Sequence, residues 1–339
     1  MRVSAILAVL LGLALTAPAP AFAWGATGHR IINGDAARTL PESVPPFLRT
    51  PQAIAEIAAL GPEADRDRGA GKTRDGDEDP AHFLDLDDDG TIGGTVKLSQ
   101  LPATREAYDT ALRKGARPTD QYARGFVQYE IADGYELLVK DFAIWRVDAY
   151  AEAHAVSTAD KTFYDDDRGL RETLILRDIG FWGHFVGDAS QPLHVSVHFN
   201  GWGDYPNSNN YTQSKKIHAK FESDFVNAHT SAGAVLSHIG PYVPAPGPIL
   251  PRVEAYLAQT NAFVPTVYRL EGAGAFDAVT PEAVGFTLDR LAAGAQMMRD
   301  LIADAYAESV NAQVGYPQIS VPDVLSGKVA PTHGLADGG

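Results

Sequence analysis

The sequence predicts an all-α protein, a single multi-helix domain with long loops. Two stretches carry apolar residues at the spacing of one helix face: Ile131, Tyr135, Leu138, Phe142 and Trp145, and then Leu288, Leu291, Ala295, Met298, Ile302 and Ala305. The alternation of apolar and polar residues that is typical of strands forms no convincing series. The 339 residues are 45% hydrophobic and include no cysteine, so we expect a full core that holds together without disulfides.

The first 23 residues have the pattern of a secretory signal peptide. Arg2 supplies a positive charge, residues 6–15 are apolar, and Ala21-Phe22-Ala23 matches a small-residue cleavage site. The apolar run is too short to cross a bilayer, and no later segment reaches that length. We therefore expect cleavage after Ala23 and an exported protein, periplasmic or secreted, with Trp24 as its new N-terminus. An uncleaved anchor is the alternative.

Helix signals continue along the chain. Thr50-Pro51 matches an N-cap followed by proline in the first turn, and Gly61 matches a helix end, which predicts a helix over 51–60. The apolar pattern predicts another helix over 170–188, ended by Pro192. Both helices are expected to bury one face in the core.

Three other stretches are expected to be irregular. Residues 62–81 contain no large apolar side chain, and residues 200–216 are polar and rich in Asn and Gly. Loops this long inside a compact domain are usually functional or disordered. Residues 311–339 show little periodicity, so we expect a loosely ordered C-terminal tail. The predicted division is a signal peptide over 1–23, one domain over 24–310, and that tail.

The charge balance restricts the function. With 28 basic against 43 acidic residues, the formal net charge is −15. An acidic surface repels polyanions, which excludes a protein that coats nucleic acid electrostatically. A phosphate ligand must be attracted locally, by a positive pocket or by metal ions.

The run from Gly183 to His194 is the strongest chemical signal. His184 and Asp188 lie four residues apart on a predicted helix, so both project from one face and can hold one metal ion. His194 follows where the chain can turn back towards the same site. His218 and Glu222 form a second pair at the same spacing. Histidine with carboxylate is the ligand set that zinc accepts when no thiolate is available.

A single pair of this kind is more often a buried histidine beside a surface acid. Two pairs together with His194, His82 and His29 favour a metal centre instead.

These residues resemble a known family. Its characteristic segments occur here in order: Trp24-Gly25-Ala26-Thr27-Gly28-His29, Ala64-Asp65, His82-Phe83-Leu84-Asp85, the run from His184 to His194, and His218-x-x-x-Glu222. The chain resembles the superfamily of zinc-dependent phospholipases C and single-strand nucleases, and more closely its S-one/P-one nuclease branch. The resemblance covers residues 24–222 and implies an all-α fold with three zinc ions in a cleft.

The resemblance also implies a ligand set for each zinc. One ion would be held by Asp65, His82, His184 and Asp188. A second would be held by His194, His218 and Glu222. The third would be held by the Trp24 amino nitrogen and carbonyl, with His29 and the bridging Asp188.

The same resemblance implies a secreted zinc-dependent phosphodiesterase, most closely a single-strand-preferring nuclease. It would hydrolyse RNA, DNA and 3′-nucleotides by zinc-activated hydroxide, with Asp65 and Arg68 catalytic. Phe83 would stack on a base, and Asp85 would hydrogen-bond to it. Against this branch, Glu222 stands where the nucleases have aspartate, and the chain has no cysteine.

Two alternatives remain open at this point. One is a zinc-dependent phospholipase C acting on a phospholipid head group. The other, from a different class, is an exported metal-binding protein without turnover. No protein partner is inferred.

A second acidic motif has a different interpretation. Asp85-x-Asp87-x-Asp89-Gly90 resembles the start of a calcium-binding loop, but Val96 stands at the twelfth position, where glutamate is expected. We interpret the segment as a solvated acidic turn, with calcium binding left open.

Overall fold

The computed structural model describes residues 24–331. The predicted signal peptide falls on residues 1–23 and therefore lies outside the described residues, as do the last eight residues of the predicted tail. No helix within the described part of the chain is both long enough and apolar enough to cross a membrane.

Helices make up most of the structure. The longer ones are α1 (Gly25–Arg38), α2 (Pro51–Leu60), α5 (Arg105–Lys114), α7 (Val127–His154), α8 (Thr158–Asp188), α12 (Ile249–Asn261), α13 (Val264–Gly272) and α14 (Pro281–Glu308). The shorter ones are α3 (Glu63–Arg66), α4 (Lys72–Glu78), α6 (Gln121–Arg124), α9 (Ile217–Ala219), α10 (Val226–His229), α11 (Ala232–Leu236) and α15 (Val321–Leu325). A π-helical segment covers Lys220–Phe225, and 3-10 turns include Asp79–His82 and Pro192–His194.

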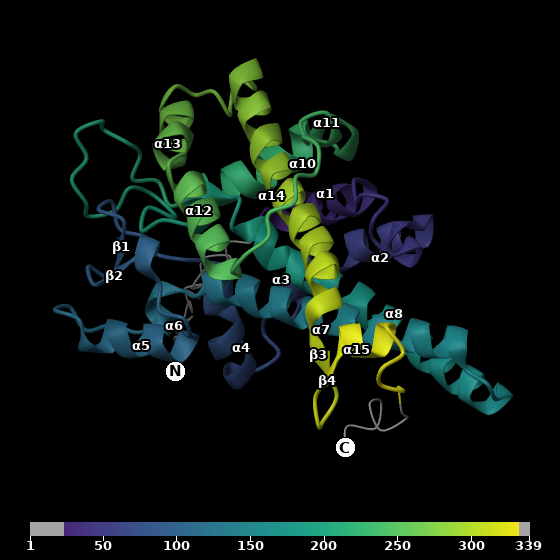
Figure 1. Ribbon diagram of the computed structural model, residues 1–339. Coiled ribbons are helices and arrows are strands. Elements are labelled where there is room, and N and C mark those ends of the chain that lie inside the picture. Colours follow the sequence, from purple (N-terminus) through teal and green to yellow (C-terminus); the bar gives the residue numbers. More distant parts are fainter. Residues whose placement is uncertain (1–23, 332–339) are drawn as a thin grey trace, which may run out of the picture.

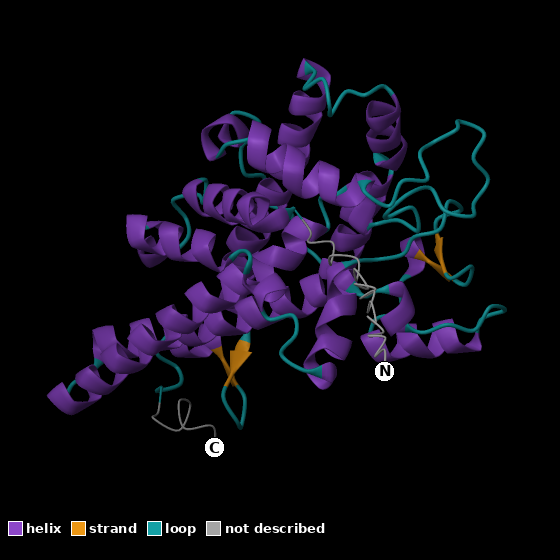
Figure 2. Ribbon diagram, turned by 180° about the vertical axis from the view of Figure 1, so that it is seen from behind, coloured by secondary structure: helices purple, strands orange, loops and turns teal. Residues whose placement is uncertain are grey.

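The all-α class is confirmed (Figure 2). Between residues 24 and 331 the strands form two short antiparallel hairpins, β1 (Thr91–Ile92) with β2 (Val96–Lys97), and β3 (Gln313–Val314) with β4 (Ile319–Ser320). In register, Ile92 pairs with Val96 and Val314 pairs with Ile319. Neither hairpin is large enough to build a core of its own.

The helices α7 and α8 pack against each other along their length and project from the rest of the body (Figure 1). The predicted stripe on α7 is buried because that face contacts α8, α12 and α14: Ile131, Leu138 and Phe142 are fully enclosed. The predicted stripe on α14 is buried in the same way. One hydrophobic cluster includes residues from Trp24 to Ala305, so the segments that carry the candidate site share a core.

The N-termini of α2 and α8 are both capped by a side-chain hydroxyl, but only the first was predicted. The Thr50 hydroxyl accepts a hydrogen bond from the Ala53 N–H at 3.1 Å, which confirms the predicted cap of α2. By contrast, α8 begins at Thr158, twelve residues before the predicted start at 170. Ser157 caps this earlier start by accepting from Asp160 N. The added turns are charged and largely exposed, so they carry no apolar stripe by which periodicity could detect them.

The C-terminal segment differs from its prediction. Instead of a loose tail, residues 313–325 form the hairpin β3–β4 and helix α15. Val314, Val321 and Val324 are buried against Ala143 and Val147 of α7, in a small separate cluster. Periodicity missed this segment because its elements are too short to show a repeating pattern.

Candidate metal centre

Seven elements bring the predicted ligands together from distant parts of the sequence. The side chains are all buried: His29 on α1, Asp65 on α3, His82 at the end of a 3-10 turn, His184 and Asp188 on α8, His194 in the turn after Pro192, His218 on α9, and Glu222 in the π-helical segment. Their ligand atoms form three groups, of which the first two share His184, and within each group the atoms lie within 4.8 Å of one another. The groups are His29, Asp65 and His184; His82, His184 and Asp188; and His194, His218 and Glu222.

Asp188 lies between two histidines. Its Oδ1 is 3.3 Å from His29 Nε2, and its Oδ2 is 3.4 Å from His184 Nε2. The two oxygens therefore face different ligands, the arrangement that a carboxylate needs to bridge two metal ions. The helical spacing explains the second contact, since His184 and Asp188 share one face of α8.

Asp65 completes this side of the site. Its Oδ1 lies 3.7 Å from His82 Nε2 and 3.9 Å from His184 Nε2. These separations are too long for hydrogen bonds and leave space between the atoms for a cation. We call His29, Asp65, His82, His184 and Asp188 the α8 group.

The remaining three ligands form a tighter arrangement, which we call the α9 group. His218 Nε2 is 2.7 Å from Glu222 Oε2 and 3.0 Å from His194 Nε2. Glu222 Oε2 is also 3.6 Å from His194 Nε2. Glu222 lies in a π-helical turn, a wider turn that is frequent at functional sites.

Backbone carbonyls orient four of the histidines. The Nδ1 atoms of His82, His184, His194 and His218 lie 3.0, 2.8, 2.7 and 2.8 Å from the carbonyl oxygens of Glu78, Gly61, His82 and Phe199. A carbonyl oxygen can only accept, so Nδ1 carries a proton in each ring, and Nε2 is the nitrogen that faces the other candidate ligands. These contacts fix the tautomer and the ring plane that metal binding requires.

The α8 group is poorly satisfied by protein atoms alone. His82 Nε2, His184 Nε2, Asp65 Oδ1 and both oxygens of Asp188 are buried and make no hydrogen bond. Buried polar atoms without hydrogen bonds are costly and rare in folded proteins. Nitrogen and oxygen atoms that converge in this way fit a bound cation, and the mixture of histidine and carboxylate fits zinc.

The pKa values of the α8 group also show that its buried charges are not compensated by the protein. Burial raises the pKa of Asp65 to about 7 and that of Asp188 to about 8. Burial also lowers the pKa values of His82 and His184 well below the ordinary value. Desolvation therefore favours the uncharged form of each group, and a bound cation would reverse this for the carboxylates.

In the α9 group the charges compensate each other. Burial lowers the pKa of His218, but the carboxylate of Glu222 outweighs this effect and the pKa is raised. Burial raises the pKa of Glu222, but His218 and His194 together outweigh it and the pKa is lowered. This pair is stabilised as an ion pair before any metal binds.

Trp24 is anchored beside these ligands. Its ring is fully buried, and its Nε1 lies 3.0 Å from the Gly187 carbonyl and 2.8 Å from Ser190 Oγ, next to Asp188. Its own carbonyl accepts a hydrogen bond from Gly28 N at 3.1 Å, which begins α1. Trp24 thus lies at the edge of the site, where its amino nitrogen is predicted to bind metal.

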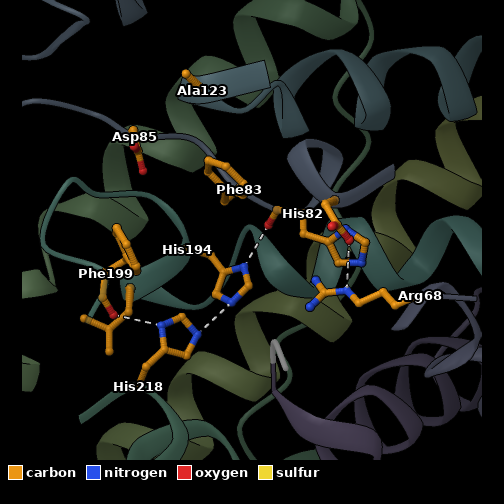
Figure 3. A pocket seen from close by; sticks show the side chains of 10 residues that line it. Arg68, His82, Phe83, Asp85, Ala123, His194, Phe199 and His218 are labelled. Atoms are coloured by element: carbon orange, nitrogen blue, oxygen red, sulfur yellow. Dashed lines mark hydrogen bonds and ion pairs between the residues drawn. The ribbon is translucent and has the colours of Figure 1, made fainter. Parts of the chain in front are cut away.

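A pocket of about 480 Å³ opens over the metal ligands (Figure 3). Arg68 lies on one side of His194, and Phe199 lies on the other. Arg68 Nε is 3.4 Å from Asp65 Oδ1 and 3.5 Å from Asp79 Oδ1, so two carboxylates hold its guanidinium at the pocket wall.

Phe83 and Asp85 line the same pocket, as the resemblance implies. Burial raises the pKa of Asp85 to about 7, although Arg124 acts in the opposite direction. Sequence reasoning missed Phe199, whose ring is 51% exposed at the pocket and whose carbonyl orients His218. Its position five residues after a predicted ligand is a weak signal by itself.

Comparisons with known proteins add little to this geometry. No protein-family model and no curated protein matches the chain. Among solved structures, the chain is similar to the alpha-toxin of Clostridium perfringens, avian strain SWCP, with 13% identity and a TM-score of 0.40. The match covers 87% of this chain and 68% of the toxin chain. A similarity this weak carries no argument about function, and the comparisons give the nuclease branch no support.

Proposed function

We propose that the protein is an exported zinc-dependent hydrolase of phosphate diesters. The observation that carries this proposal is the convergence of two buried groups of histidine and carboxylate ligands beneath a pocket that also holds an arginine. Bound zinc would supply a Lewis acid that neutralises the phosphate and activates water. An acidic protein can accept a polyanion at such a site because the metal ions supply the local positive charge.

The residues have distinct roles in this proposal. The α8 group and the α9 group would hold three zinc ions, with Asp188 as the bridging ligand and the Trp24 amino nitrogen completing the third site. The backbone carbonyls hold the rings of His82, His184, His194 and His218 in position. Arg68 would donate hydrogen bonds to phosphate oxygens as negative charge develops, because its guanidinium already lies at the pocket wall.

Single-stranded nucleic acid is the substrate class that the pocket side chains favour. The rings of Phe83 and Phe199 both line the pocket, and an unpaired base can stack on such surfaces. Asp85 would hydrogen-bond to the base edge. A duplex would be a poor substrate because its bases cannot reach the rings.

A phospholipid head group is the second candidate. The ligand in the π-helical turn is glutamate, as in the phospholipases that the sequence resembles, and a phosphodiester is the reacting group in both substrates. A protein that binds metal without turnover is the third possibility. The position of Arg68 at the pocket wall beside Asp65 favours catalysis, since its guanidinium can stabilise negative charge on a phosphate there.

A substrate panel tests the proposal. Purified mature protein, beginning at Trp24 and loaded with zinc, is assayed with single-stranded DNA, RNA, 3′-AMP and phosphatidylcholine. The matched control is Asp188→Asn, which keeps the shape of the side chain and removes its charge.

We expect hydrolysis of the single strands that chelation and the control substitution both abolish. Robust hydrolysis of phosphatidylcholine with negligible cleavage of single strands would replace the nuclease proposal with the phospholipase. Full zinc content without any hydrolysis would support the binding protein.

A further inference from the structure

His198 lies buried where the long polar loop begins, and both of its ring nitrogens face acceptor atoms. Nδ1 is 2.8 Å from the Trp202 carbonyl oxygen, and Nε2 is 2.9 Å from Asp88 Oδ1. The contacts therefore hold the imidazole ring between a carbonyl and a carboxylate.

Aromatic rings enclose the imidazole. It stacks on the indole of Trp202 with centroids 3.6 Å apart and planes 11° apart, and it contacts the ring of Tyr205 with centroids 4.9 Å apart. The hydroxyl of Tyr268 donates to the His198 carbonyl at 2.6 Å, so the backbone is fixed as well. His198 is thus the point around which residues 198–205 are organised.

The contact between His198 and Asp88 joins two chain segments that run side by side. Leu84 N donates to the His194 carbonyl at 2.9 Å, and Val197 N donates to the Leu86 carbonyl at 3.1 Å. The contact between His198 and Asp88 follows next along both segments. This side-chain contact lies at the end of a short series of backbone hydrogen bonds between the two segments.

Each segment carries one wall of the pocket. Phe83 and Asp85 precede Asp88 on one segment, and Phe199 directly follows His198 on the other. The Phe199 carbonyl also accepts from the ring of the metal-ligand candidate His218. A change in the separation of the two segments would therefore move the aromatic surfaces that face the substrate.

The acidic turn provides an internal comparison. Asp87 Oδ2 accepts from Gly94 N at 2.9 Å, and Asp89 Oδ1 accepts from Thr91 N at 3.0 Å. These carboxylates stabilise their own turn, whereas Asp88 reaches across to the other segment. Asp88 thus has a structural role that differs from that of its neighbours Asp87 and Asp89.

We propose that His198 and Asp88 are a positioning pair that sets the separation of the two pocket walls and thereby the affinity for the substituent carried by the phosphate. Neither residue belongs to the candidate ligand groups or lines the pocket, so loss of the pair should weaken substrate binding more than it slows the chemistry. The effect on substrate binding depends on the proposed function, whereas the effect on loop order does not.

The test uses the mature zinc-loaded protein and its variants Asp88→Ala, Asp88→Asn and Asp89→Ala. Because Asp88 is 60% exposed, its substitution leaves no cavity in the core. Asp88→Asn keeps an oxygen that can accept the hydrogen bond, and Asp89→Ala is the matched control on the same turn. The measurements are kcat and KM on a single-stranded oligonucleotide, zinc content, and amide hydrogen exchange of residues 199–216.

We expect Asp88→Ala to raise KM roughly five- to tenfold, as for the loss of one ordinary hydrogen bond, with kcat within about twofold. Zinc content should be unchanged and exchange of residues 199–216 faster. Asp88→Asn should recover at least half of the KM change, and Asp89→Ala should match the unaltered protein.

Unchanged KM and unchanged exchange in Asp88→Ala would overturn the proposal, as would absence of recovery in Asp88→Asn or a KM change accompanied by zinc loss. If the unaltered protein hydrolyses no phosphodiester, the proposed function fails. The exchange measurement then decides the role of the pair by itself.

Discussion

The α8 group and the α9 group use similar residues but differ in how the protein satisfies them. In the α8 group, His184 Nε2 lies 3.4 Å from Asp188 Oδ2 and 3.9 Å from Asp65 Oδ1, and these three buried atoms make no hydrogen bond. In the α9 group, His218 and Glu222 make an ion pair at 2.7 Å. The first arrangement is costly until a cation enters, whereas the second must open before one can bind. Metal binding should therefore contribute more to stability at the α8 group.

The substitutions Asp188→Asn and Glu222→Gln test this difference most directly. Asp188→Asn should reduce kcat/KM by more than about a hundredfold, beyond the range known for groups that merely support metal ligands. It should also raise the melting temperature of the metal-free protein, because a neutral amide is cheaper to bury than an uncompensated carboxylate.

Glu222→Gln should lower zinc content by about one ion per chain and lower the metal-free melting temperature, because it breaks the ion pair with His218. The measurements are calorimetry with and without chelator, and zinc analysis. Equal shifts of the metal-free melting temperature in the two variants would contradict the comparison.

Trp24, the predicted N-terminal residue after cleavage, would extend the α8 group through Asp188. Adding one residue before Trp24 converts its amine into an amide, which no longer offers the nitrogen lone pair that zinc needs. We expect the extended protein to lose about one zinc per chain and more than about tenfold in kcat/KM. Mass spectrometry establishes the N-terminus, and zinc analysis gives the stoichiometry. Full metal content in the extended protein would remove Trp24 from the ligand set.

Arg68 lies on the α8 side of the pocket, where it contacts Asp65. Arg68→Ala should lower kcat about a hundredfold with a smaller effect on KM, because the contact strengthens only as charge develops on the phosphate. Arg66→Ala is the control, since Arg66 is exposed and pairs with Glu63 on the surface. Steady-state kinetics on an oligonucleotide distinguishes the two. A change confined to KM would assign Arg68 to ground-state binding.

Phe83 directly follows His82 of the α8 group and lines the pocket, so its substitution tests substrate binding. Phe83→Ala should raise KM for single strands roughly fivefold to a hundredfold, equivalent to the ~1–3 kcal/mol that stacking on one base supplies. Tyr122→Ala removes an exposed ring that is not among the pocket residues and should have no effect. An effect of Phe83→Ala on phosphatidylcholine turnover alone would assign the pocket to a lipid.

Helical spacing predicted part of this site, because two residues four positions apart on a helix lie close together on one face. His184 and Asp188 meet as the spacing requires, as do His218 and Glu222. Asp65, His82 and His29 come from separate elements, and the family resemblance, not spacing, indicated them. The all-α class followed from two long apolar stripes.

Other features of the site and the fold could not be predicted from residue types. The carbonyls of Gly61 and Glu78 orient ligands, but any residue supplies a carbonyl, so no sequence pattern marks them. The pairing of His198 with Asp88 spans more than a hundred residues and depends on the final packing. The charged start of α8 and the short elements after residue 312 escaped periodicity for the reasons given above.

One hydrogen bond links the α8 group to the α9 group. The ring of His194, in the α9 group, is oriented by the backbone carbonyl of His82, a residue of the α8 group. Any movement of His82 on metal binding is therefore transmitted to a ligand of the other group. Binding free energies linked in this way are reciprocal, so each group must raise or lower the affinity of the other by the same factor. The order of metal uptake is then a property of the fold, and a zinc titration should depart from the curve of independent sites.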